Sequence, residues 1–273
     1  MDDEAKPPRV LIIAGSDSGG GAGIQADIKT VTVLGGFAMT AITAITAQNT
    51  CEVAEVEAIE PWLIQRQIEV VLSDLGADVI KTGMLPTRGA VKAVAASLGS
   101  HSVPLVVDPV LVATSGGRLA ESDVARALLM DLIPRASLVT PNLPEAEALS
   151  GVHIECREDF ERAADTLLTT GVGAVLIKGG HLPGDTICDL LRTADGEQVW
   201  FEDERIVTRS THGTGCTLAS AIATNLGEGH TLSHAVRLAR EYVRQAMLAA
   251  PGFGNGHGPL NHAFACRAGA TSP

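Results

Sequence analysis

The chain has 273 residues, with 20 lysines and arginines against 32 aspartates and glutamates, which gives a formal charge of −12. Such an acidic chain is a poor candidate for binding nucleic-acid phosphates, which requires a basic face, so we expect no nucleic-acid partner. Hydrophobic residues make up 45% of the chain and charged residues 19%, which favours a large buried core and excludes a disordered chain. Without an uninterrupted run of 18 apolar residues, the sequence predicts no membrane span.

The spacing of the cysteines and the composition of the N-terminus indicate in which cellular compartment the protein is found. The five cysteines are widely spaced and form no CxxC pair, which fits neither a disulfide framework nor a zinc site. The first residues are polar and lack the apolar stretch of a secretory signal. We therefore predict a cytoplasmic protein, with a plastid or mitochondrial location left open if a transit peptide has been removed.

Short apolar runs alternate with segments of helical periodicity along the chain. In chain order, the expected strands are 9–14, 41–47, 78–82, 105–108, 137–140, 174–178, 189–193, 198–201 and 205–208. The expected helices are 22–34, 61–75, 88–98, 122–132, 144–150, 159–170, 215–226 and 232–249. This alternation predicts βαβ units and a mostly parallel sheet with helices on both faces. We predict one three-layer α/β domain over residues 1–273, with a polar tail at 1–8 and a glycine-rich tail at 251–273.

Polar or glycine-rich residues follow nearly every expected strand. In open α/β sheets, ligands bind beyond the carboxyl ends of the strands. Each of these segments alone could be a plain turn, but their coincidence predicts a binding site. One of them, residues 21–26, matches the dinucleotide fingerprint G-x-G-x-x-A. We reject that interpretation because the match begins too long after the strand, and because Gln48 and Asn49 stand where the ribose-binding acid belongs. No P-loop motif is present.

A stronger phosphate signal comes late in the chain. Gly213, Thr214, Gly215 and Cys216 stand directly before an apolar helix, where converging backbone N–H groups and the helix dipole favour an anion. The same position lowers the pKa of a cysteine, which makes Cys216 a candidate proton acceptor. The alternative is a capped helix start with an inert thiol.

A lysine and two acids complete the candidate site. Lys178 ends a buried strand and could pair with phosphates, while Asp108 and Glu145 could hold Mg²⁺. Each residue also has an ordinary explanation, as a solvated lysine, a turn aspartate and a first-turn glutamate. Taken together, an anion hole, a cation and acids indicate phosphoryl transfer outside the P-loop class.

The motifs resemble those of hydroxymethylpyrimidine/phosphomethylpyrimidine kinases. They occur in family order at residues 14–27, 46–50, 81–85, 108–110, 140–146, 178–181 and 211–218. The resemblance extends from about residue 9 to about residue 258, nearly the whole chain. It implies the ribokinase-like fold and a homodimer. It also implies ATP-dependent phosphorylation of 4-amino-5-hydroxymethyl-2-methylpyrimidine, and then of its monophosphate, for thiamin biosynthesis.

The resemblance also implies roles for individual residues. Those expected to contact the pyrimidine are Gln48, Gly15, Asp27, Met84 and Val110. Those expected to serve ATP are Lys178, Asn142 and Thr211, with Glu145 and Asp108 for Mg²⁺. Residues 213–216 would form the anion hole. Many ribokinase-like sugar kinases carry Asp where this chain has Cys216, so a simple carboxylate-base mechanism does not transfer.

Two other functions stay open at this stage. Pyridoxal kinase shares the implied fold and phosphorylates a hydroxymethyl group on a similar ring. A non-catalytic pyrimidine-binding protein could also keep the fold, although the intact Lys178, Glu145 and residues 213–216 argue against it.

Overall fold

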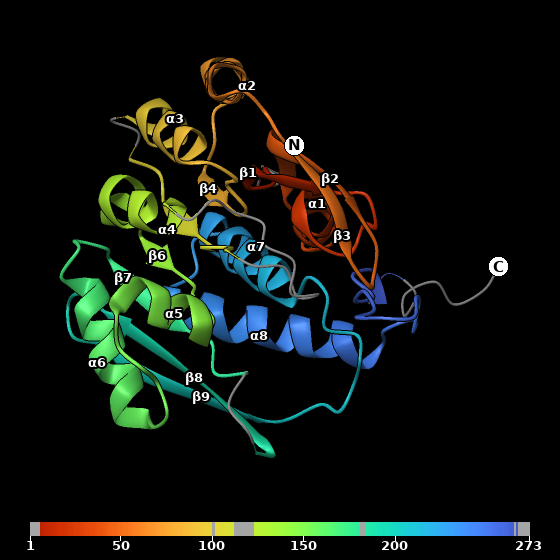
Figure 1. Cartoon of the computed structure of the whole chain (residues 1–273), viewed down its shortest axis with the longest axis vertical. Helices are drawn as coiled ribbons and strands as arrows, with labels where there is room; N and C mark the ends of the chain where they lie inside the picture. Colours follow the sequence, from red (N-terminus) through yellow and green to blue (C-terminus); the bar gives the residue numbers. More distant parts are fainter. Residues whose placement is uncertain (1–5, 100–101, 112–122, 181–183, 265, 267–273) are drawn as a thin grey trace, which may run out of the picture.

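The computed structural model describes residues 6–99, 102–111, 123–180, 184–264 and 266. These residues form one nine-stranded sheet in the order β3-β2-β1-β4-β5-β6-β7-β8-β9 (Figure 1). The strands are β1 (Arg9–Asp17), β2 (Phe37–Gln48), β3 (Val53–Ala58), β4 (Val79–Thr82), β5 (Leu105–Val107), β6 (Leu138–Val139), β7 (Ala174–Ile177), β8 (Thr186–Thr193) and β9 (Gln198–Glu204). Every neighbouring pair from β2 to β7 is parallel, whereas β3 and β8 pair antiparallel with their neighbours. The predicted mostly parallel sheet is therefore confirmed.

Helices cover both faces of this sheet. They are α1 (Gly23–Val33), α2 (Pro61–Asp74), α3 (Arg88–Leu98), α4 (Val124–Ala127), α5 (Leu143–Ser150), α6 (Arg157–Leu168), α7 (Thr214–Gly227) and α8 (Leu232–Leu248). Helix α4 continues into a π turn and a 3₁₀ turn that end at Arg135. Side chains of α1, α7 and α8 share one buried cluster, and those of α2 to α6 share the other. The three-layer prediction is thus confirmed.

Alternating residues of the central strands belong to these two buried clusters. Leu11 and Ile13 of β1 pack with α2 and α3, whereas Val10 and Ile12 pack with α1 and α7. All four side chains are fully buried. Burial on both faces explains the continuous apolar sequence of these strands.

Among the differences between the predicted and observed strands, three concern where the sheet ends or which segments join it. Strand β1 does not stop at Gly15 but reaches Asp17, because Ser16 and Asp17 still pair with Ile45 and Thr46 of β2 beyond a bulge. Strand β3 was not predicted, since its glutamates and half-exposed positions hide the apolar pattern at the sheet edge. Residues 205–208 do not form a strand.

Parts of four predicted segments lie outside the described residues. They are the start of the helix at 122–132, His181 of the 178–181 motif, residues 1–5 of the polar tail, and residues 265 and 267–273 of the glycine-rich tail. Within the described part of the chain, no helix combines the length and the apolar character that a membrane span needs.

Candidate active site

A cavity of about 1020 Å³ lies at the carboxyl ends of the central strands. It brings together residues that are up to about 200 positions apart in the chain. The predicted site residues that line it are Gly15, Gln48, Met84, Asp108, Val110, Asn142, Glu145, Lys178, Thr211, Gly213, Thr214, Gly215 and Cys216. These residues from separate strand ends therefore line one continuous cavity.

Asp27 is the exception among the predicted pyrimidine contacts. It is not part of the cavity wall, and its side chain is fully buried. Both of its carboxylate oxygens accept hydrogen bonds from Lys81 Nζ, at 3.0 and 2.9 Å, and Ser220 Oγ donates to Oδ1 at 2.7 Å. Asp27 therefore joins α1 to β4 and α7 in the protein interior, and its predicted place among the residues lining the pyrimidine pocket is wrong.

The end of β1 forms one wall of the cavity. A methyl group on Gly15 would lie 2.9 Å from Met84 Sδ, so the Met84 side chain occupies the space that a larger residue would need. Half-buried Gln48 ends β2 beside this wall, and its Oε1 is 3.3 Å from Thr46 Oγ1. An amide carries a donor and an acceptor, which suits a nitrogen-containing ring.

Asp17 is a site residue that the sequence argument missed. Its carboxylate accepts the backbone N–H groups of Gly19, Gly21 and Ala22 at 2.8–3.0 Å. It also lies 2.9 Å from Nε2 of His212. Burial opposes its ionisation, but the hydrogen bonds from His212 and the turn amides outweigh burial and hold the pKa of Asp17 below its usual value.

The two glycine-rich turns of the site touch each other. A Cβ at Gly213 would lie 1.9 Å from the carbonyl oxygen of Gly21, and Gly213 has a φ of +83° that other residues rarely adopt. A Cβ at Gly21 would in turn lie 2.5 Å from the His212 ring. Glycine at both positions allows the turns before α1 and α7 to close the cavity floor.

Lys178 lies in a dense group of charges. Its Nζ is 3.0 Å from Asp108 Oδ1, which also accepts a hydrogen bond from Thr140 Oγ1 at 3.1 Å. Burial disfavours the ammonium, yet the nearby Asp108 and Glu145 outweigh burial and raise the pKa of Lys178. The lysine is therefore a permanent cation beside Gly215, where an added Cβ would lie 3.2 Å from Nζ.

Glu145 begins α5 in a capping box with Asn142. Asn142 Oδ1 accepts the N–H of Glu145 at 3.0 Å, and Glu145 Oε2 accepts the N–H of Asn142 at 2.9 Å. Only 6% of Glu145 is exposed, and burial raises its pKa to about 7 against the attraction of Lys178. A bound cation near Glu145 would favour the ionised carboxylate and so offset the effect of burial on its pKa.

Residues 213–216 form the start of α7, with Gly213 as the N-cap. They were predicted to stand directly before the helix, but the helix already begins at Thr214. Within the described residues, no protein group accepts the backbone N–H of Gly215 or Cys216. The first N–H groups of a helix have no partner inside the helix, so these two amides are available to an anion.

The prediction of a low Cys216 pKa is wrong. Desolvation raises it to about 12, and the carboxylates of Asp27 and Asp108 add to this effect. Lys81 and the N–H of Gly23 favour the thiolate but do not compensate. The Cys216 side chain is therefore a neutral thiol at neutral pH, not a thiolate ready to accept a proton.

Comparison with known proteins identifies the family. The model of the family described as phosphomethylpyrimidine kinase matches residues 17–261. The chain belongs to the phosphomethylpyrimidine kinase family. A hydroxymethylpyrimidine/phosphomethylpyrimidine kinase from Streptomyces coelicolor is 45% identical over 95% of this chain and 96% of its own length. The thiamine biosynthesis bifunctional protein ThiED from Geobacter sulfurreducens is 46% identical over 94% of this chain, which spans about half (52%) of that relative.

Membership of this family makes the protein a kinase and removes the non-catalytic alternative. Among solved structures, the pyridoxal kinase from Staphylococcus aureus in complex with AMP-PCP and pyridoxal has a TM-score of 0.85 and 33% identity, over 94% of each chain. The predicted ribokinase-like fold is confirmed by this likeness. Pyridoxal kinase thus shares the fold, whereas the relatives with 45–46% identity are named as pyrimidine kinases or as a thiamine biosynthesis protein.

The large cavity has a further wall whose residues were not predicted from the sequence. It comes from α8 and the segment after β9, and includes Ile206, Val243 and Met247. Val243 and Met247 are four residues apart, so they share one helix face, but only the fold shows that this face meets the cavity.

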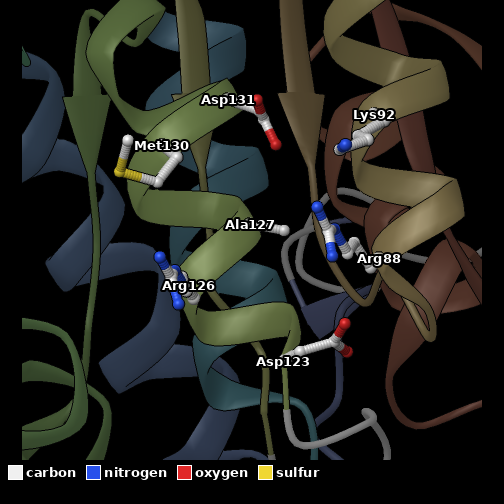
Figure 2. Close-up of a pocket in the computed structure, with 7 residues that line it drawn as sticks. All are labelled: Arg88, Lys92, Asp123, Arg126, Ala127, Met130 and Asp131. Carbon is white, nitrogen blue, oxygen red and sulfur yellow. The ribbon is translucent and has the colours of Figure 1, made fainter.

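A second hollow, of about 420 Å³, lies between α3 and the helical segment that begins with α4 (Figure 2). None of its lining residues lines the large cavity. Arg88 and Lys92 of α3 face Asp123 and Asp131 across it. Its charges are mixed, unlike the converging donors beside α7.

Proposed function

We propose that the protein transfers the γ-phosphoryl group of ATP to the hydroxymethyl group of 4-amino-5-hydroxymethyl-2-methylpyrimidine, and then to the resulting monophosphate. The product would be the pyrimidine diphosphate that thiamin biosynthesis consumes. The observation that carries the proposal is the large cavity, which Gln48 and Met84 line together with Lys178 and residues 213–216. Near-full-length relatives that bear this kinase name support the choice of substrate.

The pyrimidine would bind at the β1–β2 end of the cavity. Gln48 would pair with the ring nitrogen and the amine, while Met84 and Val110 would pack on the apolar ring. Gly15 keeps that space open, because any side chain there would displace Met84. Asp27 takes no part in this contact, since it is buried in its pair with Lys81.

The nucleotide would bind between Lys178 and α8. Lys178 would neutralise the charge of phosphate oxygens. Asn142 and Thr211 line the cavity and would contact the nucleotide at the same end. The chemistry of Asp108 and Glu145 fits Mg²⁺, which prefers carboxylate oxygens together with water and phosphate. When bound, Mg²⁺ would offset the negative charge of the phosphates.

The residues of this chain would stabilise the transferring group by position and charge. The free N–H groups of Gly215 and Cys216 face the site where negative charge develops, and Lys178 stands beside them. Phosphoryl transfer has a loose transition state, so early proton removal contributes little. We therefore assign the main role to the backbone amides and Lys178, and give the neutral Cys216 thiol a smaller one.

The test is steady-state ADP formation by the purified protein with ATP, with and without Mg²⁺. The acceptors are the pyrimidine alcohol, its monophosphate and pyridoxal, assayed in parallel. The proposal expects both pyrimidine acceptors to be phosphorylated with a higher kcat/KM than pyridoxal. Activity confined to pyridoxal would overturn it in favour of the pyridoxal kinase alternative.

We also propose that the protein forms a homodimer. Ile45 of β2 and Trp62 of α2 are large apolar side chains that are 53% and 65% exposed. A second copy of the chain would cover these apolar groups. Analytical ultracentrifugation should show a dimer for the native protein and a shift towards monomer for Ile45→Asp. A native monomer would refute the proposal.

A further inference from the structure

His212 lies between the two ends of the site. It directly precedes the α7 turn, and only 6% of it is exposed. Its Nε2 is 2.9 Å from Asp17 Oδ2 and 3.4 Å from Nε2 of Gln48. One imidazole nitrogen therefore faces both a carboxylate and the amide that we assign to the ring of the substrate.

The contact with Asp17 decides where the proton lies. An ionised carboxylate only accepts hydrogen bonds, so Nε2 of His212 must carry the proton that it shares with Asp17. The low pKa of Asp17 keeps this carboxylate ionised at neutral pH. Nε2 therefore has no lone pair for the Gln48 NH₂ group, and two donors would face each other if that group pointed at His212.

Thr46 gives the same answer from the other side of Gln48. Its hydroxyl lies 3.0 Å from the carbonyl oxygen of Ser16 and 3.3 Å from the Gln48 amide. The Ser16 carbonyl can only accept and is the nearer of the two groups, so it takes the one hydroxyl proton and leaves Thr46 with lone pairs for Gln48. All groups are satisfied when the Gln48 amide is turned over, so that its oxygen and NH₂ group exchange the positions given above. The NH₂ group then faces Thr46 and the oxygen faces His212.

We propose that His212 is a positioning residue that fixes the direction of the Gln48 amide and so favours an aminopyrimidine over a 3-hydroxypyridine ring. One amide hydrogen and one oxygen lone pair then stay free for the ligand in a set order. A 4-aminopyrimidine offers an acceptor nitrogen next to an amine donor, which can pair with both. Pyridoxal has no amine beside its ring nitrogen. This inference rests on the proposed assignment of Gln48 to the substrate ring.

The test compares wild type with His212→Ala, His212→Gln and His212→Asn, and uses the exposed His234→Ala as a control outside the cavity. For each protein, kcat and KM are measured for the pyrimidine alcohol, pyridoxal and ATP. We expect His212→Ala to raise the pyrimidine KM about tenfold, the effect of losing one hydrogen bond, with little change in kcat or in the KM for ATP. The preference for the pyrimidine over pyridoxal should fall by a similar factor.

The conservative variants separate positioning from support of the fold. A glutamine places its NH₂ group near the position of Nε2, whereas asparagine is too short to do so. His212→Gln should therefore keep most of the pyrimidine preference, and His212→Asn should lose it, even if His212→Ala fails to fold. An equal fall in kcat for both acceptors at unchanged KM, or an unchanged preference in folded His212→Asn, would overturn the inference. Wild-type protein without pyrimidine kinase activity would instead refute the proposed function.

Discussion

The glycine-rich turns before α1 and α7 have similar compositions but use their backbone amides differently. In the turn before α1, the N–H groups of Gly19, Gly21 and Ala22 all bind the carboxylate of Asp17. In the first turn of α7, which follows the second of these glycine-rich turns directly, those of Gly215 and Cys216 have no acceptor within the described residues. The first turn contains its own anion, whereas the second stays ready for one from a ligand.

This difference shows why glycine content alone does not identify a phosphate site. A turn that encloses a carboxylate of its own chain gains rigidity and loses its capacity for a ligand anion. Each turn also has its own lysine. Lys29 Nζ donates to the carbonyl oxygen of Gly20 at 2.7 Å, while Lys178 lies beside Gly215 at the open turn. These paired features allow direct tests of the comparison.

The largest expected effect follows from removing the cation at the open turn. Lys178→Ala should lower kcat/KM about 10²- to 10³-fold, because a preorganised electrostatic group beside the transferring phosphoryl is lost. Lys29→Ala is the matched control and should change kcat/KM less than about twofold, since exposed contacts of this kind contribute little. Steady-state kinetics with both variants test the comparison. Similar losses would mean that the two turns are functionally equivalent.

A second test removes the Asp17 carboxylate from the turn before α1. Asp17→Ala leaves three backbone donors without their acceptor, and should lower the free energy of unfolding by about 2–3 kcal/mol in urea titrations at pH 7. The pKa of Asp17 is depressed in the fold, so its contribution is present above the ordinary aspartate pKa and is lost as the pH falls through the depressed value. The difference between wild type and variant should therefore shrink in acid. A difference independent of pH would contradict the role of the carboxylate charge.

A third test concerns Gln48, the residue that we assign to the pyrimidine ring. Gln48→Leu should weaken pyrimidine binding by about 1–3 kcal/mol, because the ring nitrogen and amine would be buried without partners. The affinity for ATP should stay close to that of wild type. Isothermal titration with each ligand measures both effects. Loss of ATP binding instead would show that the two ends of the cavity are wrongly assigned.

The smallest effect concerns the Cys216 side chain. Burial raises its pKa to about 12, so the thiol has no charge to lose at neutral pH, and the backbone amides survive its replacement. Cys216→Ala should therefore lower kcat less than about tenfold. At pH 7.5, alkylation of Cys216 should be slower than that of the exposed Cys51, as mass spectrometry of peptides can measure. Rapid alkylation of Cys216 with a pH midpoint near 7 would restore the thiolate hypothesis.

Much of the fold and the outline of the site follow from the sequence, because apolar strands and the polar residues at their ends leave local signals. Lys178 and Glu145 illustrate this, since each follows a recognisable apolar run. Other features depend on distant neighbours. The high pKa of Cys216 arises from burial together with Asp27 and Asp108, which no local pattern brings together. The occupation of the first turn by Asp17 likewise depends on the extension of β1 along β2.

The failed predictions have the same physical origin. Residues 205–208 have strand-like composition but no strand partner among the described residues. Strand β3 has such a partner in β2 despite its charged residues. Pairing, rather than composition, decides whether a segment at a sheet edge becomes a strand.

The buried pair of Asp27 and Lys81 has a consequence for how relatives of this protein can diverge. Both side chains are fully inaccessible to solvent, so replacing either one alone would leave an uncompensated charge in the interior, at a cost of about 3–5 kcal/mol. Replacing both by apolar residues of similar volume avoids that cost. Substitutions at the two positions should therefore be correlated during evolution, and a lineage that keeps one of these charges should also keep the other.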